Sequence, residues 1–159
     1  MAGYLYPPFP AGLYTLESRV LIADTDAELR QRLYRRLLDI DVFSDCAANA
    51  GEALQKLDEN TTYGVILVDA GLPHGGVERV VDRIDRMERA QRPIVIVLAA
   101  VPQSTRSLDV EIVQIVLRRP VDLTQLVDVV QSCIRSTAAG RQRRASSPEA
   151  GRVRDQPMS

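Results

Sequence analysis

The sequence has few of the residues that mark metal-binding and redox proteins. Its 159 residues include no Trp, one His and two Cys. The two cysteines, Cys46 and Cys133, lie far apart and follow no metal-ligand spacing, so no zinc motif is indicated. We expect both thiols to be reduced and buried, as is usual for isolated cysteines.

Long apolar segments and a strong net charge are also missing. The longest uninterrupted apolar run is eight residues, 94–101, whereas a membrane-spanning helix needs about 20. No positively charged segment followed by a continuous apolar stretch opens the chain, so no secretory signal is indicated. The net charge of -1 gives no strong attraction to nucleic acid or acidic membranes. We therefore predict a cytoplasmic protein that binds neither.

The two ends of the chain differ in composition from its middle. Residues 1–17 are rich in Pro and hold four of the seven aromatic residues. Disordered tails usually lack aromatics, so we expect this arm to dock on its own domain or on a partner, with a floppy leader as the alternative. Residues 138–159 carry five Arg and few apolar residues, which predicts a disordered basic tail. The folded domain is thus predicted to span residues 18–137.

Apolar periodicity predicts alternating strands and helices within this domain. The segment 101–110 is short and polar and has room for at most a brief additional helix. Near-continuous apolar strands that alternate with helices predict a doubly wound α/β fold, with a five-stranded parallel sheet covered on both faces. The predicted strands are 19–24, 41–47, 63–69, 93–100 and 111–118, and the predicted helices are 27–39, 50–60, 76–90 and 121–137.

Two acidic residues stand where predicted strands end. In an open parallel sheet the ligand crevice lies at the carboxyl ends of the strands. The first strand ends at Asp24 and the third at Asp69, which predicts a pair of carboxylates suited to Mg²⁺. Directly after Asp24, at the start of the first predicted helix, Thr25 and Glu28 are spaced as a capping box. Asp26 would be a second capping acid at the positive end of this helix.

Four motifs in this order resemble the receiver domain of two-component response regulators. They are "VLIADTDAELR", "VILVDAGLPHGG", "PIVIVLAA" and "LRRPVD", and the resemblance covers residues 18–137. It implies the flavodoxin-like strand order 2-1-3-4-5. It also implies that Asp69 accepts a phosphoryl group from a histidine kinase, that Asp24 binds Mg²⁺, and that the backbone carbonyl of Gly71 completes the metal site.

The chain departs from the family pattern at four positions. Thr25 stands where the family has a second acid, which predicts a weak Mg²⁺ site unless Asp26 can reach the ion. Ala99 replaces the usual Thr or Ser at the end of the fourth strand, and cannot donate a hydrogen bond to a phosphoryl group. Arg119 replaces the usual Lys and presents a planar fork instead of a compact ammonium. Val116 replaces the aromatic switch residue on the fifth strand.

Two functions follow from the resemblance, and neither is enzymatic. The first is a single-domain, atypical response regulator of a bacterial phosphorelay, with Asp69 as phosphoacceptor and partner binding as output. Its partners would be a histidine kinase or phosphotransfer protein, a downstream protein, and a second copy in a homodimer. The alternative is a pseudo-receiver that binds proteins independently of phosphorylation. A small nucleotide-binding enzyme is disfavoured, because no G-x-G-x-x-G follows the first strand and no P-loop Lys is present.

Overall fold

The computed structural model describes residues 19–60, 62–101 and 108–146, with side chains up to residue 137. Within this part of the chain five strands form one parallel sheet in the order β2-β1-β3-β4-β5. The strands are β1 Arg19–Ala23, β2 Ser44–Ala47, β3 Tyr63–Asp69, β4 Ile94–Ala99 and β5 Val113–Arg118. The helices are α1 Ala27–Leu38, α2 Ala50–Glu59, α3 Gly76–Asp85 and α4 Leu123–Ser146, with a short 3-10 helix, η3, at Arg89–Gln91.

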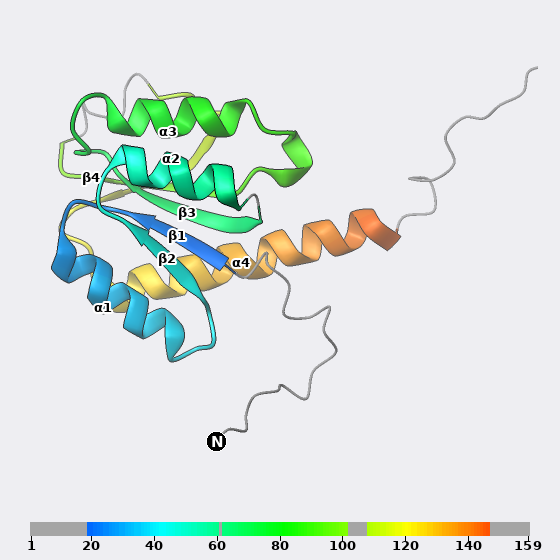
Figure 1. Ribbon diagram of the computed structural model, residues 1–159. Helices are drawn as coiled ribbons and strands as arrows, with labels where there is room; N and C mark the ends of the chain where they lie inside the picture. The colour runs from blue at the N-terminus through cyan, green and yellow to red at the C-terminus, as the bar shows by residue number, and fades with distance from the viewer. Residues whose placement is uncertain (1–18, 61, 102–107, 147–159) are drawn as a thin grey trace, which may run out of the picture.

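Helices cover both faces of the sheet, as the doubly wound prediction requires. Figure 1 shows α2 and α3 on one face, and α1 and α4 on the other. Successive strand side chains point to opposite faces, so Ile66 belongs to the core under α2 and α3, and Leu67 to the core under α1 and α4. This two-sided burial is the reason the strands are apolar at nearly every position.

Strand β3 lies at the centre of the sheet and ends with Asp69 at the carboxyl ends of the strands. All seven residues of β3 are buried, and the strand pairs with β1 on one side and with β4 on the other. Ala23 of β1 is level with Val68, so Asp24, the next residue, comes level with Asp69. The register of two neighbouring strands therefore places the two acids side by side.

The end of α1 is a tight reversal that feeds the chain into β2. Asp41 adopts the left-handed conformation with φ 62°. The N–H of Asp41 donates to the carbonyl of Leu38, and the N–H of Val42 donates to that of Leu37, which is the hydrogen-bond pattern of a Schellman motif. Leu37 and Val42 are both buried in the same core. The turn brings the next residue, Phe43, beside β1.

The start of α3 packs closely against the start of α2. Gly75, with φ 65°, makes the left-handed turn before the helix. A Cβ on Gly76 would lie 2.6 Å from Cβ of Leu72 and 3.1 Å from Cβ of Ala50. Only glycine fits at position 76, because no room exists for a methyl group.

Four predicted boundaries are wrong by a few residues, and one of them is the start of α4, at Leu123 instead of 121. Strand β2 begins at Ser44 instead of 41, because the preceding residues form the turn after α1. Strand β5 begins at Val113 instead of 111, because the N–H groups of Ile112 and Val113 bind the carbonyl of Asp109 in a turn. Helix α3 ends at Asp85 instead of 90, and the chain then turns into η3.

Helix α4 continues beyond the predicted domain boundary at residue 137 and ends at Ser146. The added stretch is rich in Ala and Arg, which favour a helix. Its last turns project past the strands (Figure 1, orange). The predicted arm 1–17 and the rest of the tail, 147–159, lie outside the described residues, as do residues 102–107 of the predicted brief helix. Of the helices described, none has the length and apolar character needed to cross a membrane.

Candidate functional site

Asp24 and Asp69 are the two buried acids in the described part of the chain. Asp24 is 2% exposed and Asp69 is 7% exposed. A buried carboxylate is costly unless hydrogen bonds or an opposite charge compensate it. The compensating groups therefore define what this site can do.

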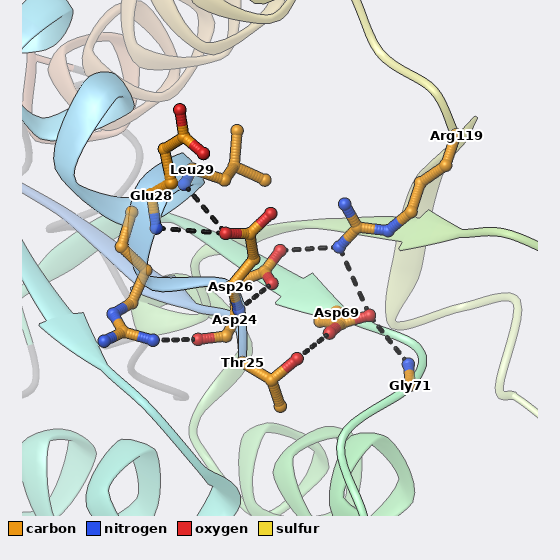
Figure 2. A network of polar contacts seen from close by, with 9 residues as sticks. Asp24, Thr25, Asp26, Glu28, Leu29, Asp69, Gly71 and Arg119 are labelled. Carbon is orange, nitrogen blue, oxygen red and sulfur yellow. Dashed lines mark hydrogen bonds and ion pairs between the residues drawn. The ribbon is translucent and has the colours of Figure 1, made fainter.

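Arg119 lies between the two carboxylates and binds both. One of its terminal nitrogens, Nη2, is 2.6 Å from Oδ2 of Asp24 and 3.2 Å from Oδ1 of Asp69 (Figure 2). The residue directly follows β5, and its N–H donates to the carbonyl of Ala99 at 3.0 Å, which fixes the backbone beside β4. The structure thus brings together the three charged residues that the sequence selected, from three different strand ends.

Further donors occupy the remaining carboxylate oxygens. Oδ1 of Asp69 accepts a hydrogen bond from the N–H of Gly71 at 2.8 Å, and Oδ2 accepts one from the hydroxyl of Thr25 at 3.1 Å. Oδ1 of Asp24 accepts the N–H of Asp26 at 2.8 Å. Together with Arg119, these bonds give each of the four carboxylate oxygens a donor from the protein, as Figure 2 shows.

Thr25 has a role that the sequence prediction missed. The capping box assigned to Thr25 is wrong, because Asp26 is the N-cap residue of α1. Oδ1 of Asp26 accepts the N–H groups of Glu28 at 3.0 Å and Leu29 at 3.2 Å. The helix starts at Ala27 as predicted, but its N-cap is one residue later than expected, which leaves the Thr25 hydroxyl to bind Asp69. Thr and Asp are both good N-caps, so local sequence offered no means to choose between them.

Arg30 is a second residue that the sequence prediction missed. Its Nη1 atom donates to the backbone carbonyl of Asp24 at 2.6 Å. This bond ties the end of β1 to the first turn of α1 and adds a second guanidinium near the acid pair. Nothing in the motif pattern indicated it, because Arg30 lies among several arginines of similar spacing on the same helix.

Burial and charge act in opposite directions on the protonation of Asp24. Burial raises the pKa of Asp24, and the negative charge of Asp69 raises it further. The hydrogen bond from the N–H of Asp26 and the ion pair with Arg119 lower it. The net result is a raised pKa. Burial lowers the pKa of Arg119, but its bonds and charge interactions with the two acids raise it more. Arg119 therefore stays charged, and the pKa of Asp24 lies above its ordinary value.

The residues present fit a Mg²⁺ ion poorly. The strand ends predict Asp24 and Asp69 as ligands, and the resemblance implies the carbonyl of Gly71 as another, with Asp26 as a further acid if it can reach the ion. Across the described ranges, no three His, Cys, Asp or Glu side chains form a group that could hold a metal ion. Asp26 uses an oxygen to cap α1, and the Arg119 guanidinium already places a positive charge between Asp24 and Asp69. Magnesium needs several oxygen ligands at about 2.1 Å in an octahedral arrangement, which two occupied carboxylates do not supply.

The resemblance assigns a hydroxyl to position 99 and an aromatic ring to position 116, and both residues are apolar in this chain. Ala99 ends β4 with a buried methyl group, 4% exposed, and can donate no hydrogen bond from its side chain. Val116 on β5 is 50% exposed and has neither an aromatic ring nor a hydroxyl. No hydroxyl from β4 therefore reaches the carboxylate pair, whereas Thr25 supplies one from the β1 side.

A cleft of about 500 Å³ opens beside the cluster. The first turns of α1 form one wall, and the segments that follow β4 and β5 form the other. It contains acidic, basic and apolar side chains, so it offers a mixed surface next to Arg119. The lining residues are Asp26, Glu28, Leu29 and Arg32 on one side, and Ala100, Arg119, Pro120 and Val121 on the other.

Comparison with known proteins gives a structural match without a sequence match. No protein-family model and no curated protein sequence matches the chain. A CheY-like response regulator receiver domain from Methanospirillum hungatei JF-1 superposes with a TM-score of 0.67 at 21% identity, over 76% of this chain and 97% of that one. The response regulator protein TrrA from Thermotoga maritima, solved in complex with Mg²⁺-BeF, gives 0.61 at 22% identity, over 72% and 97%.

A third solved structure that is similar to this chain has a different name. The adenylate cyclase from Rhodopirellula baltica superposes with a TM-score of 0.70 at 18% identity, over 81% of this chain and 96% of that one. Such likenesses, together with the parallel sheet of order 2-1-3-4-5, confirm that the chain has the fold of a CheY-like receiver domain.

Proposed function

We propose that this chain is a protein-interaction module of two-component signalling, built on the receiver fold, in which phosphoryl transfer to Asp69 is weak or absent. The observation that carries the proposal is the bridge made by Arg119, whose Nη2 atom lies 2.6 Å from Asp24 and 3.2 Å from Asp69. A side-chain cation replaces what the resemblance assigns to a metal ion.

The chemistry of phosphoryl transfer supports this assignment. Transfer to a carboxylate needs an oxygen free for in-line attack, and groups that neutralise the phosphoryl oxygens as charge develops on them. Both oxygens of Asp69 accept hydrogen bonds from the protein, from Gly71 and Arg119 on one side and Thr25 on the other. Ala99 supplies no further donor. We therefore expect Asp69 to be a poor nucleophile that holds the site together.

The output of such a module is binding and not catalysis. The cleft beside Arg119 combines two acids, two arginines and apolar side chains, a mixture that suits a protein surface. The partner would be a histidine kinase, a phosphotransfer protein or a downstream signalling protein in the cytoplasm. Homodimer formation belongs to the same proposal, and sedimentation at several protein concentrations measures it.

Intact-mass spectrometry of the full chain after incubation with acetyl phosphate and Mg²⁺ tests the proposal. We expect little or no phosphoryl adduct on the wild-type chain. The Asp69→Asn variant is the matched control, because its side chain has the same shape and cannot be phosphorylated. A stoichiometric adduct on the wild type that disappears in Asp69→Asn would overturn the proposal.

A gain-of-function variant makes a negative result informative. The triple variant Thr25→Asp, Ala99→Thr and Arg119→Lys restores the family residues at three site positions. We expect it to form an adduct on Asp69 under conditions in which the wild type does not. An adduct on the triple variant alone shows that the reagent and the fold are competent, and that the three substitutions suppress transfer.

A second candidate is an atypical phosphorelay receiver with Asp69 as the true acceptor. The position of Asp69 favours it, since the side chain ends the central strand and remains 10% exposed at the crevice. In that case Arg119 would neutralise the phosphoryl oxygens in place of the usual Lys. The same mass measurement separates the candidates, because this one requires a wild-type adduct that depends on both Asp69 and Arg119.

A further inference from the structure

Three large apolar side chains are exposed around the end of α1, and we call them the α1-end patch. Tyr34 is 40% exposed, Leu38 is 42% exposed and Phe43 is 56% exposed. Tyr34 and Leu38 are one turn apart and adjacent on the helix surface. Phe43 follows the reversal that ends the helix. Single exposed apolar residues are normal, but three at one chain reversal suit an interaction surface.

The N-terminal arm joins the domain beside this patch. The described chain begins with β1 at Arg19, and the N–H of Val20 donates to the carbonyl of Phe43 at 2.9 Å. Figure 1 shows the start of β1, the end of α1 and the start of β2 on the same side of the molecule. Residues 1–18 lie outside the described residues. They join the fold at Arg19, and the next residue, Val20, is hydrogen-bonded to Phe43.

The composition of the arm complements the patch. The first 16 residues contain no charged side chain and include Tyr4, Tyr6, Phe9 and Tyr14. Aromatic side chains gain free energy when they leave water, so this composition favours docking on an apolar surface. Three prolines, at positions 7, 8 and 10, restrict the backbone and lower the entropy lost when the arm is ordered.

The arm is long enough to cover the patch. An extended polyproline-type chain rises about 3.1 Å per residue, so the segment from Phe9 to Arg19 spans about 30 Å. Helix α1 has 12 residues and is therefore about 18 Å long. Of the three other exposed large apolar residues that the structure describes, Val110 and Val116 lie with β5 at the opposite edge of the sheet, farther from the start of the arm. The third, Val101, follows the carboxyl end of β4.

We propose that residues 4–14 dock on the α1-end patch of the same molecule, with their aromatic side chains covering Tyr34, Leu38 and Phe43. The docked arm covers apolar surface next to β2, the edge strand of the sheet. Without the arm, this surface would be exposed to water. A partner that competes for the patch would have to displace the arm. The docking concerns a surface remote from the acid cluster, so it holds whether or not Asp69 is phosphorylated.

Hydrogen exchange measured by mass spectrometry tests the docking on four proteins. These are the full chain, a chain lacking residues 1–17, the variant Phe43→Ser, and the control Val116→Ser, which removes a similarly exposed apolar side chain at the far edge. We expect amides at the end of α1 and in β2 to exchange about tenfold faster in the shortened chain and in Phe43→Ser. Val116→Ser is expected to leave those amides unchanged. Equal exchange in the full and shortened chains would overturn the proposal.

A fluorescence reporter tests the same contact without shortening the chain. The protein has no Trp, so Phe9→Trp places a single indole in the arm. We expect its emission to shift to longer wavelength when Phe43→Ser is added, and to stay unchanged when Val116→Ser is added. An emission that ignores Phe43→Ser would contradict docking on this patch.

Protein concentration separates docking within one molecule from exchange of arms between two. Docking within the molecule predicts the same exchange rates and emission over an about tenfold range of concentration. Protection that grows with concentration would instead assign the patch to the arm of a second copy, and would overturn the intramolecular proposal.

Discussion

At the scale of single residues, the site is a buried cluster of charged groups in which protein donors bind every carboxylate oxygen of Asp24 and Asp69. A guanidinium that bridges two carboxylates offsets part of the free energy needed to take all three charges out of water. Arginine suits this position because its fork is planar and weakly hydrated, whereas the ammonium of Lys is compact and strongly hydrated. Arg119 thus places a positive charge between the two acids without an added ion.

Removal of Arg119 is expected to destabilise the protein. Arg119→Ala leaves Asp24, which is 2% exposed, beside Asp69 with no cation between them. We expect the free energy of unfolding at pH 7 to fall by about 2 kcal/mol, below the range for fully buried pairs because Arg119 is 23% exposed. Urea unfolding measures the change.

The neighbouring arginine provides the control for that experiment. Arg118 is exposed at the end of β5, and Arg118→Ala removes the same number of atoms and the same charge. We expect a change of less than about 0.5 kcal/mol. Similar losses in both variants would mean that the bridge to the acids contributes no special stability.

The pKa of Asp24 predicts how stability depends on pH. Its folded-state pKa is raised above the usual 3.8, mainly by burial. The folded state therefore binds the proton more tightly than the unfolded chain does. The contribution of Asp24 is fully present below about pH 3.8 and is lost as the pH rises through the raised pKa.

The comparison with Asp24→Asn isolates this effect from other carboxylates. As the pH falls from 7 toward about 4, the free energy of unfolding of the wild type should rise relative to that of the variant. Urea unfolding at a series of pH values gives the difference. A difference that moves in the opposite direction would mean that the ion pair with Arg119 outweighs burial, and that the pKa of Asp24 is lowered.

At the scale of elements, close packing decides where α3 begins. Helix α3 starts at Gly76 without a side-chain cap, and its first turn lies against Leu72 and Ala50. Helices α1 and α2, in contrast, start with side-chain caps from Asp26 and Asn49. The start of α3 is therefore held by packing, which makes it sensitive to volume.

Addition of one methyl group at the start of α3 is expected to be costly. Gly76→Ala places a Cβ 2.6 Å from Cβ of Leu72, which forces the backbone to shift. We expect the free energy of unfolding to fall by about 2 kcal/mol, the usual cost of overpacking. Gly51→Ala in α2 is the control, because its Cβ meets only the Asn49 side chain, at 3.3 Å.

The control is expected to be neutral or slightly stabilising. The Asn49 side chain can move by a few tenths of an ångström, and alanine favours a helix over glycine by up to about 1 kcal/mol. Thermal unfolding of both variants makes the comparison. Equal midpoints for Gly76→Ala and Gly51→Ala would contradict the packing at the start of α3.

At the scale of the whole molecule, one sheet divides two cores, and α4 closes one of them. Among the side chains that the structure describes, up to residue 137, the last one of α4 in this core is Ile134, whereas the helix backbone continues to Ser146. The first part of α4 therefore belongs to the folded unit, and the last turns extend from it.

Shortening α4 should separate these two parts. A chain that ends at Thr137 keeps every α4 core residue among the described side chains, so its free energy of unfolding should stay within about 0.5 kcal/mol of that of the full chain. Far-ultraviolet circular dichroism should show less helix. A chain that ends at Val129 loses Val130, Cys133 and Ile134 from the core and is expected not to fold. Unfolding of the chain that ends at Thr137 would show that the projecting turns are part of the core.

The sequence by itself determined the fold, because burial on both faces of a parallel sheet imposes a pattern that a single chain displays. Apolar runs ending in Asp24 and Asp69, with helical periodicity between them, indicated the order of the elements and the edge where the acids meet. Boundaries were less certain, since a turn such as the one at Asp41 depends on hydrogen bonds that the pattern does not encode.

Only the tertiary structure decided which side chains bind the two acids. The sequence selected Arg119 as a substitution but did not show that its guanidinium lies between the two acids, because that contact joins residues 95 positions apart. It assigned Thr25 to a helix cap, and the structure turns the hydroxyl to Asp69 because Asp26 caps the helix one residue later. Local propensity cannot distinguish two equally good caps, whereas the meeting of three strand ends in space can.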